Sequence, residues 1–179
     1  MAKPHDLSFW DWNTMVESFH NESDRGAAVL GGGFVENYLG IYLQSLVVDS
    51  KVANDLFQAV GPLSSFSQRI AVARAFGFIS KKQYDDLTLI RKIRNHFAHH
   101  PLDASFSDPP VAQLATKLSE LKTAIESQPK DEAERNRRAY LFSCGMFCGG
   151  AYQTMEKGVG AIDSKTKDTN NADANNKTR

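Results

Sequence analysis

A polar cluster near the middle of the chain has the residue types that phosphodiester chemistry needs. Arg91, Asn95 and His99 recur at intervals of four residues, and Arg94 adjoins them. On a helix this spacing places the first three on one line. A neutral histidine can accept the proton of a ribose 2′-hydroxyl, while an arginine stabilises charge on the phosphate oxygens. Arg94, Asn95 and His99 are therefore our candidate catalytic residues, for cleavage of RNA without a metal ion.

The same cluster also has structural interpretations. Basic residues near the end of a helix are favoured by its dipole, and His99 and His100 can cap the last carbonyl groups. Asn95 can satisfy a buried backbone group. His96 and His100 stand four residues apart, a spacing that binds divalent metals on a helix, but the sequence suggests no third ligand nearby. We expect no metal site and no cofactor.

The charges are balanced overall and uneven along the chain. The 179 residues carry 21 basic and 21 acidic side chains. Residues 1–65 have 3 basic and 8 acidic ones, a net charge of −5, whereas residues 66–100 have 7 and 2, a net charge of +5. A protein that wraps DNA would show an overall basic excess. A short connection at residues 77–80, followed by two lysines and a glutamine, is the best place for base readout, but the composition argues against direct DNA binding.

No segment has the length and apolarity of a membrane span, which needs roughly 18 or more apolar residues. Asp6, Asp11 and Glu17 interrupt the first twenty residues, so these do not form a signal peptide. We expect a cytoplasmic protein with no membrane partner. Cys144 and Cys148, the two cysteines, lie four residues apart in an expected helix and are interpreted as small buried thiols.

The spacing of apolar residues is helical almost throughout, which predicts an all-α fold. We expect a single bundle of about six to seven helices, formed by residues 1–160, and a disordered C-terminal tail at 161–179, which has almost no apolar residues. Ser23 and Ser80 are the expected N-caps of the two central helices. The helices are expected at about 6–20, 24–48, 51–59, 63–76, 81–100, 111–125 and 132–157.

Two groups of glycines stand inside expected helices and need an explanation. Residues 31–33 are all glycine, and each costs roughly 1 kcal/mol relative to alanine in a helix interior. Close approach of a neighbouring backbone is the reason we favour. A phosphate-binding loop is the alternative, but the preceding strand and the following Lys-Ser/Thr are missing. Gly145, Gly149 and Gly150 are likewise expected to mark close packing.

An apolar seam marks the expected helix at 111–125. Its members follow a 3-4-3-4 spacing: Val111, Leu114, Leu118, Leu121 and Ile125. Such a narrow seam packs in a bundle or against a second chain. It is one reason to expect a homodimer.

Four sequence segments together resemble a known bacterial family. They are ESDRGAA at 22–28, GPLSSFSQRI at 61–70, FGFIS at 76–80 and YDDL at 84–87. In this order they resemble the mannitol operon repressor-like family over roughly residues 22–127. The resemblance implies a helical protein without an evident helix-turn-helix, which controls transcription of sugar-alcohol uptake genes through protein contacts.

The segment Arg94-Asn95-His96-Phe97-Ala98-His99 also resembles the R-x4-H signature of the HEPN superfamily of small helical domains. Domains of this superfamily commonly form dimers that bring two such motifs into one cleft, and active members cut RNA without metal. The resemblance implies that Arg94 stabilises phosphate charge, that His99 is the general acid/base and that Asn95 is its polar companion.

The sequence therefore favours a regulatory protein that acts as a helical homodimer through a protein partner. The alternative is a metal-independent endoribonuclease of the HEPN type, with RNA as its partner. A structural bundle without either activity is the third hypothesis.

Overall fold

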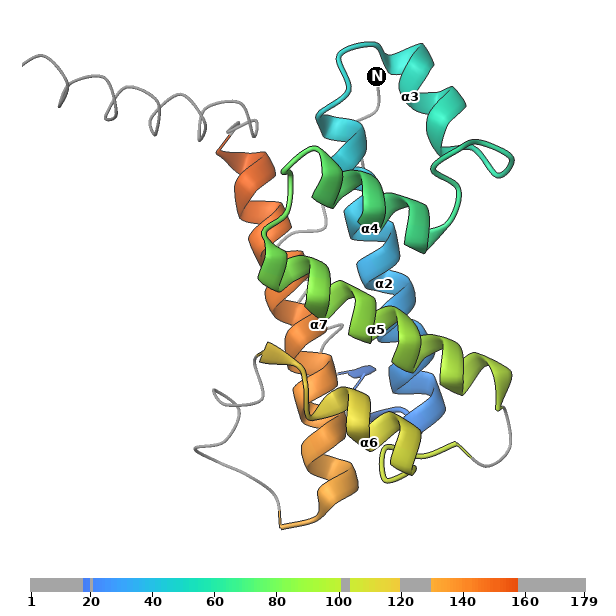
Figure 1. Ribbon diagram of the computed structural model, residues 1–179, viewed down its shortest axis with the longest axis vertical. Helices are drawn as coiled ribbons and strands as arrows, with labels where there is room; N and C mark the ends of the chain where they lie inside the picture. The colour runs from blue at the N-terminus through green and yellow to red at the C-terminus, as the bar shows by residue number, and fades with distance from the viewer. Residues whose placement is uncertain (1–17, 20, 101–103, 120–129, 158–179) are drawn as a thin grey trace, which may run out of the picture.

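The computed structural model describes residues 18–19, 21–100, 104–119 and 130–157, which contain six α-helices and no strand (Figure 1). The prediction of an all-α fold is confirmed. The helix expected at 6–20 and the tail expected at 161–179 lie almost entirely outside the described residues. The helices are α2 (Asp24–Ser45), α3 (Ser50–Phe57), α4 (Phe66–Ala75), α5 (Lys81–His99), α6 (Pro109–Ala115) and α7 (Glu132–Glu156).

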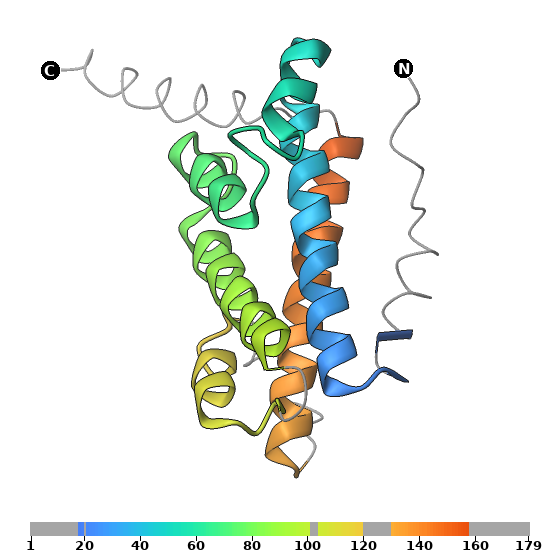
Figure 2. The same ribbon diagram turned by 90° about the vertical axis from the view of Figure 1, so that its right-hand side faces the viewer.

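The helices form two layers. The long helices α2 and α7 lie side by side in one layer, and α4, α5 and α6 cover one side of that pair (Figures 1 and 2). α3 lies beyond the end of α2. None of the described helices is both long and apolar enough to cross a membrane.

Local sequence fixes both ends of α2. The Ser23 hydroxyl accepts the Gly26 N–H at 3.0 Å, and Asp24 supplies the negative charge favoured in a first turn. The expected N-cap is thus confirmed. The helix ends at Ser45, earlier than expected, because Asp49 begins the next helix by accepting the N–H groups of Lys51 and Val52 at 2.8 and 3.2 Å.

The core lies between the two layers, and aromatic side chains connect the layers across it. Phe106 connects the layers, with ring centroids 4.8 Å from Phe97 of α5 and 5.6 Å from Tyr140 of α7. Cys144 and Cys148 are buried free thiols, as expected. Burial raises the pKa of both thiols, so they stay protonated in the folded protein.

The helix expected at 111–125 is shorter in the structure. α6 ends at Ala115, and the backbone N–H of Ser119 then donates to Asp86 of α5 at 3.0 Å. Between Ala115 and Ser119 the chain follows turns rather than an α-helix. Val111 and Leu118 are buried in the core of the same chain. The described half of the seam therefore packs within the bundle, while Leu121 and Ile125 lie outside the described residues.

The glycines of α2 have different surroundings. A Cβ on Gly31 would lie 3.3 Å from the Leu141 side chain, and one on Gly32 would lie 2.7 Å from the Arg94 Cβ. Close approach is thus confirmed for these two, although side chains rather than a backbone approach them. At Gly33 no described atom lies within 4 Å of the Cβ position.

The expectation for α7 was wrong at two positions. A Cβ on Gly149 or Gly150 would have no described atom within 4 Å. Neither glycine is therefore at a packed contact among the described residues.

Candidate functional site

The helix that carries the candidate residues, α5, is defined by its sequence at both ends. The Ser80 hydroxyl accepts the Gln83 N–H at 3.2 Å, and the Gln83 side chain accepts the Ser80 N–H at 2.8 Å, which is a complete capping box. At the other end the His100 N–H still donates to the His96 carbonyl at 3.0 Å. Pro101 follows and disfavours a further helical turn.

One face of α5 is buried and the opposite face is polar. Four apolar side chains face the core: Leu87, Ile90, Ile93 and Phe97. On the polar side Arg91 and Asn95 are partly exposed and His99 is exposed. No hydrogen bond joins Asn95 or His99 to another described side chain. The predicted polar line therefore lies on the surface.

Arg94 is turned away from this line and towards α2. Its guanidinium forms an ion pair with Glu36 of α2, and both side chains are 24% exposed. It also lies over the ring of Phe66, with Cζ 5.9 Å from the centroid. The Arg94 stem fills the space left by Gly32. Arg94 Nε is buried without a hydrogen-bond partner among the described residues. Arg94 thus links α2, α4 and α5.

Helix geometry explains why Arg94 and His99 have different surroundings. A separation of five residues corresponds to a rotation of about 140° around a helix axis. The two side chains therefore leave α5 on different sides, one at the contact with α2 and the other at the exposed C-terminal end. Within one chain, the structure brings Arg94 to Glu36 rather than to His99.

The two histidines with metal-ligand spacing make other contacts. His96 and His100 stack with ring centroids 4.3 Å apart, and the His100 Nδ1 lies 2.9 Å from the His96 carbonyl oxygen. The His96 Nε2 lies 3.5 Å from Asp108. No group of three or more His, Cys, Asp or Glu side chains among the described residues is arranged to hold a metal ion.

A second arginine joins segments that sequence reasoning did not connect. Arg137 of α7 donates to Asp24 at 2.8 Å and to the Phe19 carbonyl at 3.0 Å, and it also donates to the Glu22 carbonyl. Asp24 in turn accepts the backbone N–H of Phe106 at 3.2 Å. No local pattern could reveal this network, because its members are far apart in the sequence.

The structure also contains a groove that the sequence did not suggest. It has a volume of about 380 Å³ and lies between the start of α5 and the middle of α7. Gln83 and Asp86 line it from α5, and Ser143 and Met146 line it from α7. The Ser143 hydroxyl is buried and has no partner among the described residues. Met146, which lines the groove, is 52% exposed, and Phe142, one helical turn earlier in α7, is 41% exposed.

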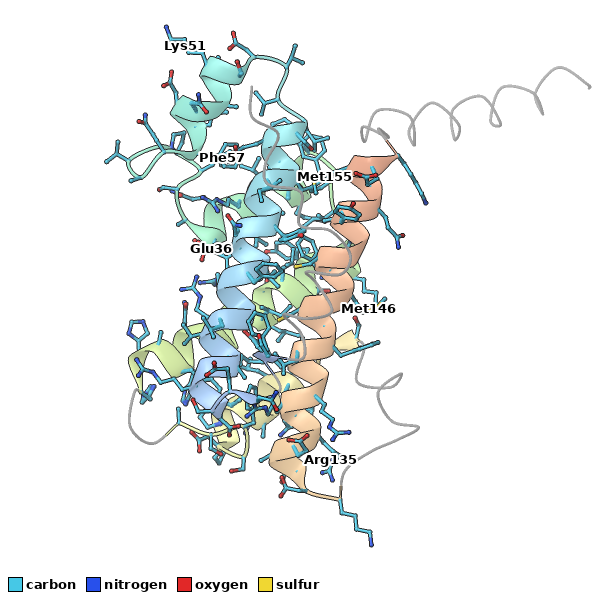
Figure 3. The ribbon with its side chains drawn as sticks, turned by 180° about the vertical axis from the view of Figure 1, so that it is seen from behind. Glu36, Lys51, Phe57, Arg135, Met146 and Met155 are labelled. Carbon is cyan, nitrogen blue, oxygen red and sulfur yellow. The ribbon has the colours of Figure 1, made fainter. Side chains whose placement is uncertain are left out.

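The groove and the Arg94 contact lie on different edges of the helix pair. Viewed from behind, Met146 projects from the side of α7 away from α2, whereas Glu36 lies on the side of α2 away from α7 (Figure 3). The lining combines apolar side chains such as Leu87 and Phe147 with charged ones such as Lys82 and Asp86. Such a mixture, with the exposed Met146 at its edge, also occurs at protein-binding surfaces.

Comparison with known proteins identifies the family. The sequence model of the family described as mannitol repressor matches residues 41–156, which is more than half of the chain. The chain belongs to the mannitol repressor family. The match extends from the second half of α2 to the end of α7, so it includes the groove and Arg94.

A solved structure shares the fold of this mannitol repressor family member. It is a chain of the X-ray structure of the MtlR-HPr complex from Escherichia coli, with a TM-score of 0.63 and 15% sequence identity. The similarity covers 78% of this chain and 97% of that one. A search of the curated proteins finds no match.

Proposed function

We propose that this mannitol repressor family member is a cytoplasmic regulatory protein that acts by binding a partner protein of the HPr type. The observation that carries the proposal is the fold shared with a MtlR protein solved in complex with HPr. The family match and the neutral overall charge agree with action through protein contacts rather than through DNA.

The groove between α5 and α7 is the surface that we assign to this partner. Phe142 and Met146 supply exposed apolar area of the kind enriched at protein interfaces. Lys82 and Gln83 add polar groups at the same place. Such a combination of apolar anchors and a few polar groups gives both affinity and orientation.

Calorimetric titration with purified HPr tests this proposal. We expect wild-type protein to bind HPr and Met146→Glu to bind it at least tenfold more weakly, because a carboxylate would be placed in the apolar contact. Val60→Glu is the matched control, since Val60 is 91% exposed and lies in the loop before α4. Absence of binding by the wild type would contradict the proposed function. Equal binding by both variants would leave the function intact and show that HPr binds at another surface.

The homodimer stays a prediction that rests on the HEPN resemblance. The described part of the seam, Val111 to Leu118, is used inside the bundle and so does not supply the interface. Light scattering at micromolar concentration tests the prediction. A monomer would remove both the dimer and any cleft shared by two copies.

Metal-independent RNA cleavage is the second candidate function. The observation in its favour is that Asn95 and His99 are accessible to solvent on the same side of α5. Its test is incubation with mixed RNA in EDTA, beside His99→Ala. Cleavage that disappears in the variant would support the activity, and equal background would remove it.

A further inference from the structure

The outward face of α7 carries no charge over almost four turns. Residues 139–152 contain no Asp, Glu, Lys, Arg or His. Most of them are buried in the bundle, and those that are not buried are apolar residues, glycines and one tyrosine: Phe142, Gly145, Met146, Gly149, Gly150 and Tyr152. Phe142 is 41% exposed and Met146 is 52% exposed. We call Phe142, Met146, Gly149 and Gly150 the α7 stripe, because their spacing places them on one side of the helix.

The glycines leave a recess in this stripe that the bundle does not use. Gly31 and Gly32 of α2 meet side chains of neighbouring helices, but a Cβ on Gly149 or Gly150 would have no described atom within 4 Å. Each glycine costs roughly 1 kcal/mol relative to alanine in a helix interior. Glycines in a helix allow another chain to approach the backbone closely. The recess begins three residues after Met146, so a protruding side chain and a hollow lie next to each other.

The two ends of this side of α7 carry opposite charges. Arg138 lies one turn before Phe142, and its side chain is 49% exposed although its Nε donates to Glu134 of the same helix at 2.7 Å. Glu156, the last residue of α7, is exposed. Arg138 and Glu156 are both rotated by about 40° from Phe142 around the helix axis, and in the same direction. The uncharged stripe is thus bordered by a cation at one end and an anion at the other.

We propose that the α7 stripe is the interface with a second copy of this chain, in which the two α7 helices are antiparallel. A two-fold interface needs a surface that is complementary to itself. The stripe has this property, because Met146 of one copy can enter the glycine recess of the other. The charges are placed for the same arrangement. Arg138 and Glu156 are nine residues before and after Phe147, so a two-fold axis at the level of Phe147 brings each arginine opposite the glutamate of the other copy.

The length of the stripe sets the expected strength of the dimer. From Arg138 to Glu156 the helix extends about 27 Å. Met146 projects from the side of α7 away from α2, so the contact is made by one helix of each copy (Figure 3). Such a contact buries less than the roughly 1,600 Å² of a standard protein interface. We therefore expect a reversible dimer with a Kd in the micromolar range.

Analytical ultracentrifugation of the full chain over the micromolar range tests the proposal. We expect the average mass to rise from monomer to dimer with concentration. Gly149→Glu should weaken association at least tenfold, because it places two carboxylates near the two-fold axis. The matched control is Gly33→Glu in α2, since Gly33 is also exposed and has an open Cβ position. A monomeric wild type, or equal weakening by both folded variants, would overturn the proposal.

Reversal of the end charges tests the antiparallel pairing. Arg138→Glu and Glu156→Arg should each weaken the dimer several-fold, because each brings like charges together, and the double variant should restore it. Arg138→Glu also removes the contact with Glu134 inside one chain. That loss is the same in the single and the double variant, so it cannot produce the rescue. A double variant as weak as the single ones would overturn the arrangement.

Cysteine cross-linking tests the register of the two helices. Met146→Cys places the two introduced thiols close to the axis and should give an intermolecular disulfide under mild oxidation. Gln153→Cys places them about 18 Å apart along the helices and should give none. Cys144 and Cys148 are buried and do not compete. Equal cross-linking at both positions would indicate parallel helices and overturn the arrangement.

The proposal gives the predicted homodimer an interface and does not rest on HPr. All three experiments are done without HPr, so their failure leaves the calorimetric test of the proposed function unaffected, and the reverse also holds. Met146 lines the groove assigned to HPr as well as the α7 stripe. The two partners would therefore exclude each other, and HPr would bind the monomer.

Discussion

Arg94 and His99 begin and end one short motif, yet the fold places them in opposite environments. Arg94 is paired with Glu36, packed over Phe66 and lodged against Gly32 at the junction of three helices. His99 is exposed in the last turn of α5 and has no side-chain partner among the described residues. Arg94 thus takes part in packing between helices, whereas His99 lies exposed on the surface.

The difference shows that the spacing of two residues in a motif can predict a helix without predicting that their side chains share one site. The two residues are about 140° apart around α5, so a contact that buries one tends to leave the other exposed. A catalytic role for both within one chain would require Arg94 to leave Glu36. Its ion pair with Glu36 and its position over the Phe66 ring instead favour a structural role for Arg94.

The strongest way to disturb the buried end is to fill the space that Arg94 occupies. Gly32→Ala would place a methyl group 2.7 Å from the Arg94 Cβ and 2.7 Å from the Tyr140 hydroxyl oxygen. We expect a loss of about 3 kcal/mol in the free energy of unfolding, measured by urea denaturation.

Gly33→Ala is the matched control for this substitution. Its methyl group meets no described atom within 4 Å, so the gain in helix propensity should stabilise the protein by roughly 0.5–1 kcal/mol. Equal effects at Gly32 and Gly33 would mean that the approach of Arg94 to α2 is not as close as described.

Removing the two ends of the motif compares them directly. Arg94→Ala deletes the ion pair with Glu36 and the packing on Phe66, and should cost about 2 kcal/mol in denaturant unfolding. His99→Ala should change stability by less than about 0.5 kcal/mol, as is usual for exposed positions. A His99 variant as unstable as the Arg94 variant would refute the assignment of His99 to the free surface.

Alkaline pH should lower the free energy of unfolding, because ionisable groups are buried near Arg94. Burial raises the pKa of Tyr140 and of the Cys144 and Cys148 thiols, so all three stay protonated in the folded protein. The unfolded thiols ionise above about pH 8.5 and therefore favour unfolding as the pH rises. We expect urea denaturation between pH 8 and 10 to show stability falling by about 1 kcal/mol or more per pH unit.

The double variant Cys144→Ala and Cys148→Ala identifies the groups responsible. Its stability should fall less steeply over the same pH range, whatever its stability at pH 7. An unchanged slope would show that other groups cause the alkaline loss.

The smallest effect is expected at the C-terminus. Residues 161–179 carry almost no apolar side chains to bury, so their deletion should leave the melting temperature nearly unchanged. A calorimetric scan of the shortened chain decides this. A large decrease would mean that the predicted domain limit at residue 160 is misplaced.

Local signals predicted the helices well where the determining contacts are local. Ser23 and Ser80 cap α2 and α5 as expected, because an N-cap interacts with residues only two or three positions further on. The failures have distant causes. α6 ends early, at Ala115, shortly before Ser119 bonds to Asp86, 33 residues away, and no described atom packs against the Cβ positions of Gly149 and Gly150.

The sequence predicted the helix that carries the candidate residues but not their surroundings. Residue spacing placed Arg91, Asn95 and His99 on one line of that helix and left open whether His99 faces solvent or the bundle, whereas in the structure His99 is exposed. The catalytic role of these residues stays a prediction. Residue spacing could not predict that Glu36, 58 residues before Arg94 in the sequence, would form its ion pair. The groove beside Ser143 also had no sequence signal, since its walls come from two helices that only the fold brings together.

The sequence by itself determined the helical class, the caps of the central helices and the resemblance to the mannitol repressor family. These depend on periodicity and on hydrogen bonds that span a few residues. Only the tertiary structure decided that Arg94 pairs with Glu36 at a contact between helices and that its side chain packs against Gly32. The same holds for the groove that Met146 lines. The physical reason is that burial and ion pairing depend on which helices are packed together, and those contacts join residues far apart in the chain.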